Sequence, residues 1–176
     1  EEIFKKLPNQ NHEFLSGKYP YTINPGGPNH EELVSLIGIY EYFDNLYNYH
    51  FEDQNLNHLK KIKKINKLIS EYEESIANPL LDYISKRNNF KLIGKNKIKN
   101  KDRSPTISFT IENKSSKKVS KILVKNNIAT RNDHFYAWRC LEALGIDTND
   151  GVVRISMTHY NNKKDVDNLI NALELI

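Results

Sequence analysis

Residues 106–127 read TISFTIENKSSKKVSKILVKNN and contain two elements of different periodicity. The first six residues alternate between polar and apolar side chains, which predicts a strand with one buried face. Ser115 or Ser116 then suits the N-cap of a helix that ends near Asn126-Asn127. Apolar residues recur within it at helical spacing, at Val119, Ile122 and Leu123. A half-buried strand followed by such a helix is typical of a sheet with helices packed against it.

The same reading extends outward from this stretch, from residue 90 to the end of the chain. Further strands are predicted at 90–93, 128–130 and 152–157, further helices at 135–144 and 164–175, and a polar, charged loop at 95–103. The order strand, strand, helix, strand, helix, strand, helix predicts an α+β fold. In this fold, helices cover one face of a small sheet.

Two longer helices are predicted upstream of the sheet. The first spans about 30–48, with Asn29 as its cap and glutamates in its first turn. The second spans about 56–86 and carries an apolar stripe opposite its lysines. Pro79 lies inside the second helix and is expected to kink or break it, because proline removes a backbone donor and clashes with the preceding turn.

Residues 1–30 are rich in proline and glycine and are expected to form loops. They do not fit inside the α+β fold. We therefore expect residues 1–50 to be a limb of a neighbouring domain and residues 51–176 to form a small α+β domain.

The composition bears on the partners of the chain. Its 176 residues include 26 Lys+Arg and 22 Asp+Glu, a formal net charge of +4. The basic runs near 60–67 and 95–103 raise the alternative of a nucleic-acid-binding domain, but aromatic residues do not interleave with them as base stacking requires. We expect solvated lysines and no nucleic-acid partner. No apolar run approaches the roughly 20 residues that span a bilayer, so no membrane partner is expected.

A single cysteine, Cys140, excludes an intramolecular disulfide and a thiolate-cluster metal site. A reducing, cytoplasmic location is the simplest expectation. Cys140 falls on the apolar side of its predicted helix with Leu141 and Leu144, so we expect it to be an inert core residue. The generic nucleotide-binding, zinc-protease and serine-hydrolase motifs do not occur, and no metal site is predicted.

Two regions could bind a ligand. Residues 24–32, NPGGPNHEE, form a glycine turn before a helix start, where free N–H groups and the helix dipole can hold an anion; a purely structural turn is the alternative. Arg154 lies among apolar residues of a predicted strand, so it either faces solvent or reaches a carboxylate. His134 and Tyr136 lie in a strand-to-helix connection, where substrate-contacting loops often occur, although His134 could instead cap the helix.

The segments of the C-terminal half, read together, resemble a known family. They are RSPTISFT (103–110), VSKILVK (119–125), NIATRNDHFYA (127–137), LEALG (141–145), GVVRIS (151–156), HYNN (159–162) and DVD (165–167). In order and spacing they are similar to the small C-terminal domain of class V aminotransferases and cysteine-desulfurase-like proteins. Upstream, GGPNHE (26–31) resembles a glycine-containing segment of the same family.

The resemblance implies a fold type I enzyme that uses pyridoxal 5′-phosphate to act on an amino-acid substrate and works as a homodimer. This chain would be the small domain with a trailing limb of the large domain. None of its lysines stands in the family's Ser/Thr-x-His-Lys context, so the cofactor lysine is implied to lie elsewhere. We expect no catalytic residue in the chain and no activity from it alone.

By position, the resemblance also implies roles for individual residues. Arg154 matches the arginine that receives the substrate α-carboxylate, and Arg131 and His134 fall in the neighbouring substrate loop. Tyr136 stands where desulfurases carry the sulfur-accepting cysteine, which favours aminotransfer or a related reaction over desulfuration. The implied cofactor contacts are Gly26, Gly27, Asn29 and His30, where Gly27 replaces a phosphate-binding threonine of many relatives. A non-catalytic oligomerisation module is the remaining alternative.

Overall fold

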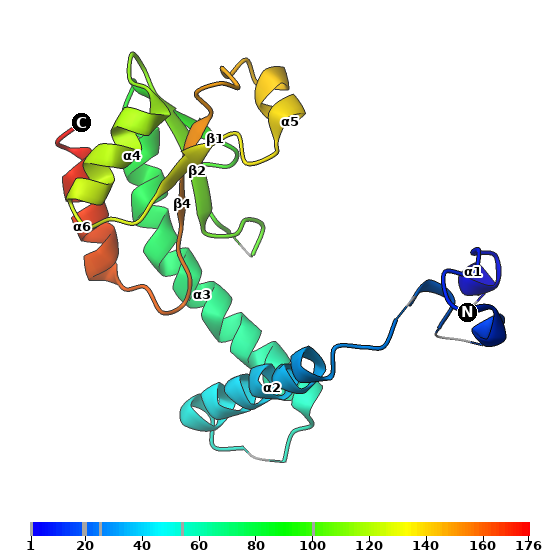
Figure 1. Cartoon of the computed structure of the whole chain (residues 1–176). Helices are drawn as coiled ribbons and strands as arrows, with labels where there is room; N and C mark the ends of the chain where they lie inside the picture. Colours follow the sequence, from blue (N-terminus) through cyan, green and yellow to red (C-terminus); the bar gives the residue numbers. More distant parts are fainter. Residues whose placement is uncertain (1, 19–20, 25, 54, 100) are drawn as a thin grey trace. The chain divides into compact units, whose positions relative to one another are not determined.

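The computed structural model describes residues 2–18, 21–24, 26–53, 55–99 and 101–176. The chain divides into two compact units, one up to Ile65 and one from Asn66 onward. The described helices are α1 (Glu2–Lys5), α2 (His30–His50), α3 (His58–Ser85), α4 (Ser116–Lys125), α5 (Trp138–Ala143) and α6 (Lys163–Leu173) (Figure 1). The described strands are β1 (Phe90–Ile93), β2 (Thr106–Ile111), β3 (Arg131–Asp133) and β4 (Val152–Ser156). None of these helices combines the length and apolar character needed to cross a bilayer.

The first unit contains α2, which starts as the sequence predicts. The Asn29 side chain accepts a hydrogen bond from the Glu32 backbone N–H at 3.1 Å, so it satisfies one of the unpaired donors of the first turn. Before α2, the expected loop contains α1 and two short 3-10 helices, at Glu13–Leu15 and Tyr21–Ile23. The cap and the helix are therefore confirmed, and the preceding region has more local structure than expected.

Part of the 60–67 lysine run packs against aromatic rings within the same unit. Tyr47 of α2 is fully buried, and Lys61 Nζ lies 5.2 Å from the centroid of its ring. Lys64 Nζ lies 5.2 Å from the ring centroid of Phe51. An ammonium group over an aromatic face contributes about 0.5–1 kcal/mol at exposed sites. Lys64 stays exposed and Lys61 is half-buried, so these ring contacts are compatible with the expected solvated lysine face and also stabilise the unit.

The second unit contains a four-stranded sheet in the order β1-β2-β4-β3, in which all pairs are antiparallel. One row of paired residues crosses the whole sheet. It runs from Ile93 to Ser108, then to Arg154, and ends at Arg131. Directly opposed residues on neighbouring antiparallel strands point to the same face, so these four side chains share one face of the sheet.

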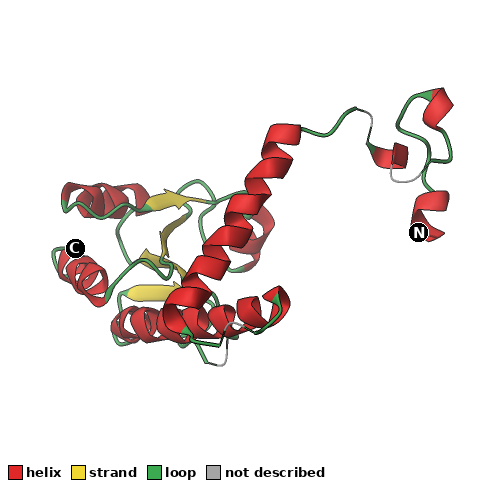
Figure 2. Cartoon of the chain, turned by 90° about the horizontal axis from the view of Figure 1, so that it is seen from below, coloured by secondary structure: helices red, strands yellow, loops and turns green. Residues whose placement is uncertain are grey.

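The other face carries the main hydrophobic core. Helices α3, α4 and α6 pack there, as Figure 1 and Figure 2 show from two directions. The strands contribute Ile107, Phe109, Ile111, Val153 and Ile155, and the helices contribute Ile76, Leu80, Leu81, Ile84, Val119, Leu123, Val166, Leu169 and Leu173. This arrangement confirms the predicted α+β fold, with three helices on one face of a small sheet.

The face that carries Arg154 is covered only in part. A small cluster of Leu141 from α5, Ile146 and Val152 packs on it, with Ile93 and Phe135 at its border. Val152 and Val153 are both buried although they point to opposite faces, because α5 covers one and the main core covers the other. The remaining part of this face is polar and accessible.

Helix α3 continues through Pro79 without a break. The residues that follow the proline, Leu80, Leu81 and Ile84, are fully buried in the main core. Burying each such side chain contributes about 1.5–3 kcal/mol. A proline in a helix interior costs about 3 kcal/mol. Pro79 therefore does not break the helix, because the three buried side chains together outweigh the lost hydrogen bond; the alternative of a kink stays a prediction.

The strand predicted at 128–130 is also misplaced, since β3 covers Arg131–Asp133. Asn127 has a left-handed φ of 61°, and its N–H donates to Val124 O at 3.0 Å. Ile128 N–H donates to Leu123 O at 3.0 Å, and its side chain packs against the main core. These two bonds and the apolar contact form a Schellman motif that ends α4. Ile128 therefore belongs to the helix cap, and pairing starts only at Arg131.

The charged loop at 95–103 is held in place by side-chain bonds. Asn78 of α3 pairs with the backbone of Ile98 in both directions, accepting at 2.8 Å and donating at 3.2 Å. Lys95 Nζ lies 2.8 Å from Asp102 Oδ2, and this hydrogen bond lowers the pKa of the Asp102 carboxyl. Arg103 donates to the carbonyl of Lys95, and partial burial lowers the pKa of its guanidinium. Two basic residues of this run, Lys95 and Arg103, therefore stabilise the loop itself.

Candidate functional site

The candidate site lies on the partly covered face of the sheet, around Arg154 of β4. Arg154 is half-buried and has Ser108 of β2 on one side and Arg131 of β3 on the other. Asn132, which alternates with Arg131, points to the opposite face and donates to Ser116 Oγ at 3.0 Å. The alternation of β3 thus places Arg131 beside Arg154 and ties the strand to α4 through Asn132.

The guanidinium of Arg154 is stacked on an aromatic ring. Its central carbon Cζ lies 3.9 Å from the centroid of the Phe135 ring. Phe135 is held in turn by the small apolar cluster of α5 and β4. A ring over one face of a guanidinium leaves its N–H edge available, and this edge is the part that binds a carboxylate in bidentate geometry. Phe135 therefore orients Arg154 without using its hydrogen-bond donors.

The loop between β3 and α5 has an unusual backbone. Phe135 and Tyr136 both have left-handed φ values, 51° and 60°, which non-glycine residues adopt at a cost of about 1–3 kcal/mol each. Tyr136 N–H donates to His134 Nδ1 at 3.1 Å, and Ala137 N–H donates to His134 O at 2.8 Å. Helix α5 consequently starts at Trp138, and the predicted start at Phe135 is wrong. The His134 imidazole stabilises this turn, while the N-cap of α5 is Ala137.

Gly151 fixes the position of this loop relative to β4. Its φ is 70°, and a Cβ atom built on it would lie 2.3 Å from the backbone carbon of Asp133 and 2.7 Å from the His134 nitrogen. Real Cβ atoms do not approach backbone atoms this closely. The close approach therefore requires glycine, and it holds Asp133 and His134 at the edge of the site.

These elements form one surface pocket of about 440 Å³. Its lining residues are Arg131, Asp133, His134, Phe135, Tyr136 and Arg154. The four residues predicted from sequence to contact the substrate thus line a single pocket. Sequence reasoning missed Phe135 and Asp133 as parts of it. Phe135 lies inside the segment 127–137 that resembles the family, which could have pointed to it. Its contact with Arg154 depends on its left-handed backbone and could not be predicted from the sequence.

The pocket has an excess of positive charge. Arg131 and Arg154 oppose each other directly, and like charges at such positions destabilise a sheet by roughly 0.2–1 kcal/mol. Within the described residues, neither guanidinium forms an ion pair. Asp133 is engaged by His134, whose N–H donates to Asp133 Oδ1 at 2.6 Å and whose Nε2 lies 3.5 Å from that oxygen. The arrangement is suited to a negatively charged ligand.

Comparison with known proteins agrees with this geometry. The family model described as Aminotransferase class-V matches residues 53–169, which contain the whole sheet and the pocket. The chain belongs to the class V aminotransferase family. One curated relative in this comparison is the aminotransferase-like protein FGM3 of Gibberella zeae, which is 32% identical over 109 residues, 61% of this chain and 27% of that protein.

Solved structures show the same fold at lower identity. The cysteine desulfurase CsdA of Escherichia coli is 22% identical with a TM-score of 0.63, over 89% of this chain and 32% of that one. The cysteine desulfurase of Thermococcus onnurineus NA1 is 20% identical with a TM-score of 0.64, over 89% of this chain and 33% of that one. The class V chain described here thus spans about a third of the length of these structures, and less of the curated relative.

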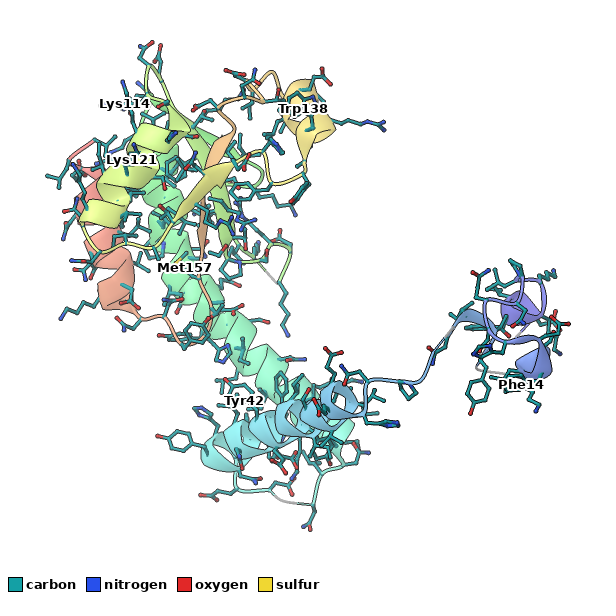
Figure 3. All side chains as sticks on the ribbon, in the orientation of Figure 1. Phe14, Tyr42, Lys114, Lys121, Trp138 and Met157 are labelled. Carbon is teal, nitrogen blue, oxygen red and sulfur yellow. The ribbon has the colours of Figure 1, made fainter. Side chains whose placement is uncertain are left out.

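Tyr136 lies on the loop between β3 and α5, and Cys140 lies within α5. Tyr136 is 99% exposed. Trp138 is the first residue of α5 (Figure 3). Cys140 is exposed on α5, so the prediction that it is an inert core residue is wrong. The core side of this short helix is taken by Leu141, and Cys140 turns outward. Cys140 is not among the residues that line the Arg154 pocket.

The segment predicted to contact the cofactor lies in the first unit. Gly26, Gly27, Asn29 and His30 are all exposed, and nothing lies within 4 Å of a Cβ atom built on either glycine. The Asn29 side chain is used as the cap of α2, and Glu31 and Glu32 place negative charge in the first turn. Within this chain the segment therefore offers an open helix start and does not form a complete phosphate site. Pro25 of the same segment lies outside the described residues.

Proposed function

We propose that this chain is the substrate-binding end of a pyridoxal-phosphate-dependent enzyme that acts on amino acids by aminotransfer or a related reaction. In this proposal, Arg154 binds the α-carboxylate of the substrate. The observation that carries it is the pocket in which Arg131, His134, Tyr136 and Arg154 come together. Because the chain spans only about a third of the solved relatives, the activity is proposed for the whole protein.

The residues of the chain would bind and orient the substrate. The guanidinium of Arg154 offers two parallel N–H donors to a carboxylate. The Phe135 ring at 3.9 Å holds the plane of these donors, and the apolar cluster behind it restrains the ring. Pyridoxal phosphate, when bound in the whole protein, would supply the electron sink for bonds at the substrate α-carbon.

Aminotransfer is favoured over cysteine desulfuration by the chemistry of the loop. Sulfur acceptance requires a thiolate, and Tyr136 offers a phenol at the position where the resemblance implies the acceptor cysteine. Cys140 is exposed but lies outside the residues lining the pocket. We therefore expect Cys140→Ser to leave amino-acid turnover by the whole protein unchanged.

The remaining parts of the proposal concern cofactor, partner and location. Gly26, Gly27, Asn29 and His30 form an open helix start, so we propose that other parts of the protein or a second subunit complete the phosphate site. A homodimer and a cytoplasmic location stay predictions that rest on the family resemblance and on the single cysteine.

The direct test is amino-acid turnover by the full-length protein with Arg154→Gln. A hydrogen bond to a charged group contributes about 1.5–3 kcal/mol, so the KM for the amino acid should rise roughly 10- to 100-fold. Lys125→Gln, which removes an exposed charge outside the pocket, is the matched control and should leave KM unchanged. An unaltered KM in the Arg154 variant would remove this residue from the site.

A second test uses the chain alone. Treatment with pyridoxal phosphate and borohydride should leave lysines labelled weakly and at many positions, because the cofactor lysine is predicted to lie elsewhere. Mass spectrometry that finds one stoichiometrically labelled lysine would contradict this prediction.

A further inference from the structure

We infer that the substrate carries a second negatively charged group in its side chain, and that Arg131 binds this group while Arg154 binds the α-carboxylate. The substrate class would be acidic amino acids and the corresponding dicarboxylic 2-oxo acids. This inference rests on the proposed function, because it assigns the role of α-carboxylate anchor to Arg154.

The register of the sheet brings the two arginines together. Arg131 and Arg154 are direct partners on adjacent antiparallel strands, and both line the same pocket. Neighbouring strands lie about 4.8 Å apart, so the two side chains leave the sheet side by side. Two carboxylates joined by two or three carbon atoms are separated by a similar distance. One dicarboxylate can therefore meet both guanidinium groups in a single orientation.

The two arginines differ in how firmly they are held. Arg154 is half-buried, and one face of its guanidinium is covered by the Phe135 ring at 3.9 Å. It is oriented for a single carboxylate at its free edge. Arg131 lies on β3 at the edge of the sheet and is exposed, with no ring stacked on it within the described residues. It can follow a side-chain group of variable position.

The charge of the pocket also favours a ligand with two carboxylates. Asp133 is the only acidic residue among the six that line it, and the backbone and imidazole of His134 already engage its carboxylate. The two guanidinium groups thus remain uncompensated by ion pairs within the described residues. A ligand with one carboxylate neutralises one of them, and a dicarboxylate neutralises both.

The test is an NMR chemical-shift titration that measures the affinity of the chain for small acids. The probes are succinate and butyrate, which have the same number of carbon atoms and differ by one carboxylate. We expect succinate to bind at least 10-fold more tightly than butyrate. Arg131→Gln should lower succinate affinity to that of butyrate and leave butyrate affinity unchanged. Lys125→Gln, which removes the same charge outside the pocket, should preserve the preference for succinate.

Equal affinities for the two acids, or no detectable binding of either, would overturn the inference without any variant. A preference for succinate that survives in Arg131→Gln would also overturn it, because another residue would then bind the second carboxylate. Arg154→Gln separates this inference from the proposed function. If that variant still binds butyrate as the natural chain does, the α-carboxylate anchor fails. If the Arg154 variant no longer binds butyrate, while the unaltered chain binds both acids with equal affinity, only the Arg131 assignment fails.

Discussion

The two faces of the sheet use the same strands for opposite purposes. On the helix-covered face, Phe109 and Val153 are paired across β2 and β4 and are almost completely buried. On the other face, Ser108 and Arg154 are paired one residue further along the same two strands and remain accessible. A period of two residues therefore separates the side chains that hold the fold from those that form the pocket. Changes on the helix-covered face should mainly lower stability, and changes on the other face should mainly alter binding.

Phe109→Ala should have the largest effect and tests whether the helix-covered face holds the fold. Phe109 is fully buried among α3, α4 and α6, and removing such a ring costs about 3–5 kcal/mol, from lost transfer energy and the cavity left behind. Urea unfolding should show this loss as a lower midpoint. Thr110→Ala, on the opposite face of the same strand, is the control and should cost about 1 kcal/mol or less. Similar losses in the two variants would mean that the faces do not differ as described.

Gly151→Ala tests the junction between the faces, where β4 begins. An alanine there would have a left-handed φ and would also place Cβ against the backbone of Asp133 and His134. Gly145→Ala is a matched control, since Gly145 has a φ of 66° and nothing within 4 Å of a Cβ atom. Both variants carry the backbone strain of about 1–2 kcal/mol. In Gly151→Ala only, the steric clash of the new Cβ atom should destabilise the fold by about 1–3 kcal/mol more.

Thermal unfolding of the two glycine variants measures this difference. The clash should also displace His134, whose ring lies 5.4 Å from that of Trp138, so the tryptophan fluorescence should change in Gly151→Ala only. Equal unfolding temperatures with unchanged fluorescence would show that the loop tolerates the extra atom.

The sequence was sufficient to predict the elements whose pattern is set by burial. The alternation at 106–111 and the periodicity of α4 and α6 follow from one buried face, and these elements form as predicted. The misplaced elements have another cause. The strand start at Arg131 and the helix start at Trp138 are set by left-handed residues, Asn127, Phe135 and Tyr136, which neither strand alternation nor helical periodicity reveals.

The same distinction applies to the candidate site. Arg154 could be singled out because a charged residue interrupts an apolar strand, and the family resemblance pointed to its neighbours. The row that joins Arg154 to Arg131 could not be predicted, because it depends on the register between β3 and β4. A shift of one residue would have sent Arg131 to the helix-covered face. The outward position of Cys140 likewise depends on where α5 begins.

Arg131→Gln has the smallest expected effect on the free energy of unfolding. It separates the two faces most clearly, because it should stabilise the fold while Phe109→Ala destabilises it. Arg131→Gln removes one of two like charges at directly opposed positions, so it should raise the free energy of unfolding by about 0.2–1 kcal/mol while it weakens dicarboxylate binding. The gain should shrink in 1 M salt, where the Debye length falls to about 3 Å. Lys121→Gln, which removes an exposed charge in the middle of α4 and outside the pocket, controls for the change in net charge and should alter stability less. A destabilised Arg131 variant would mean that this guanidinium makes an attractive contact within the fold, and the pocket would then need no anion to balance it.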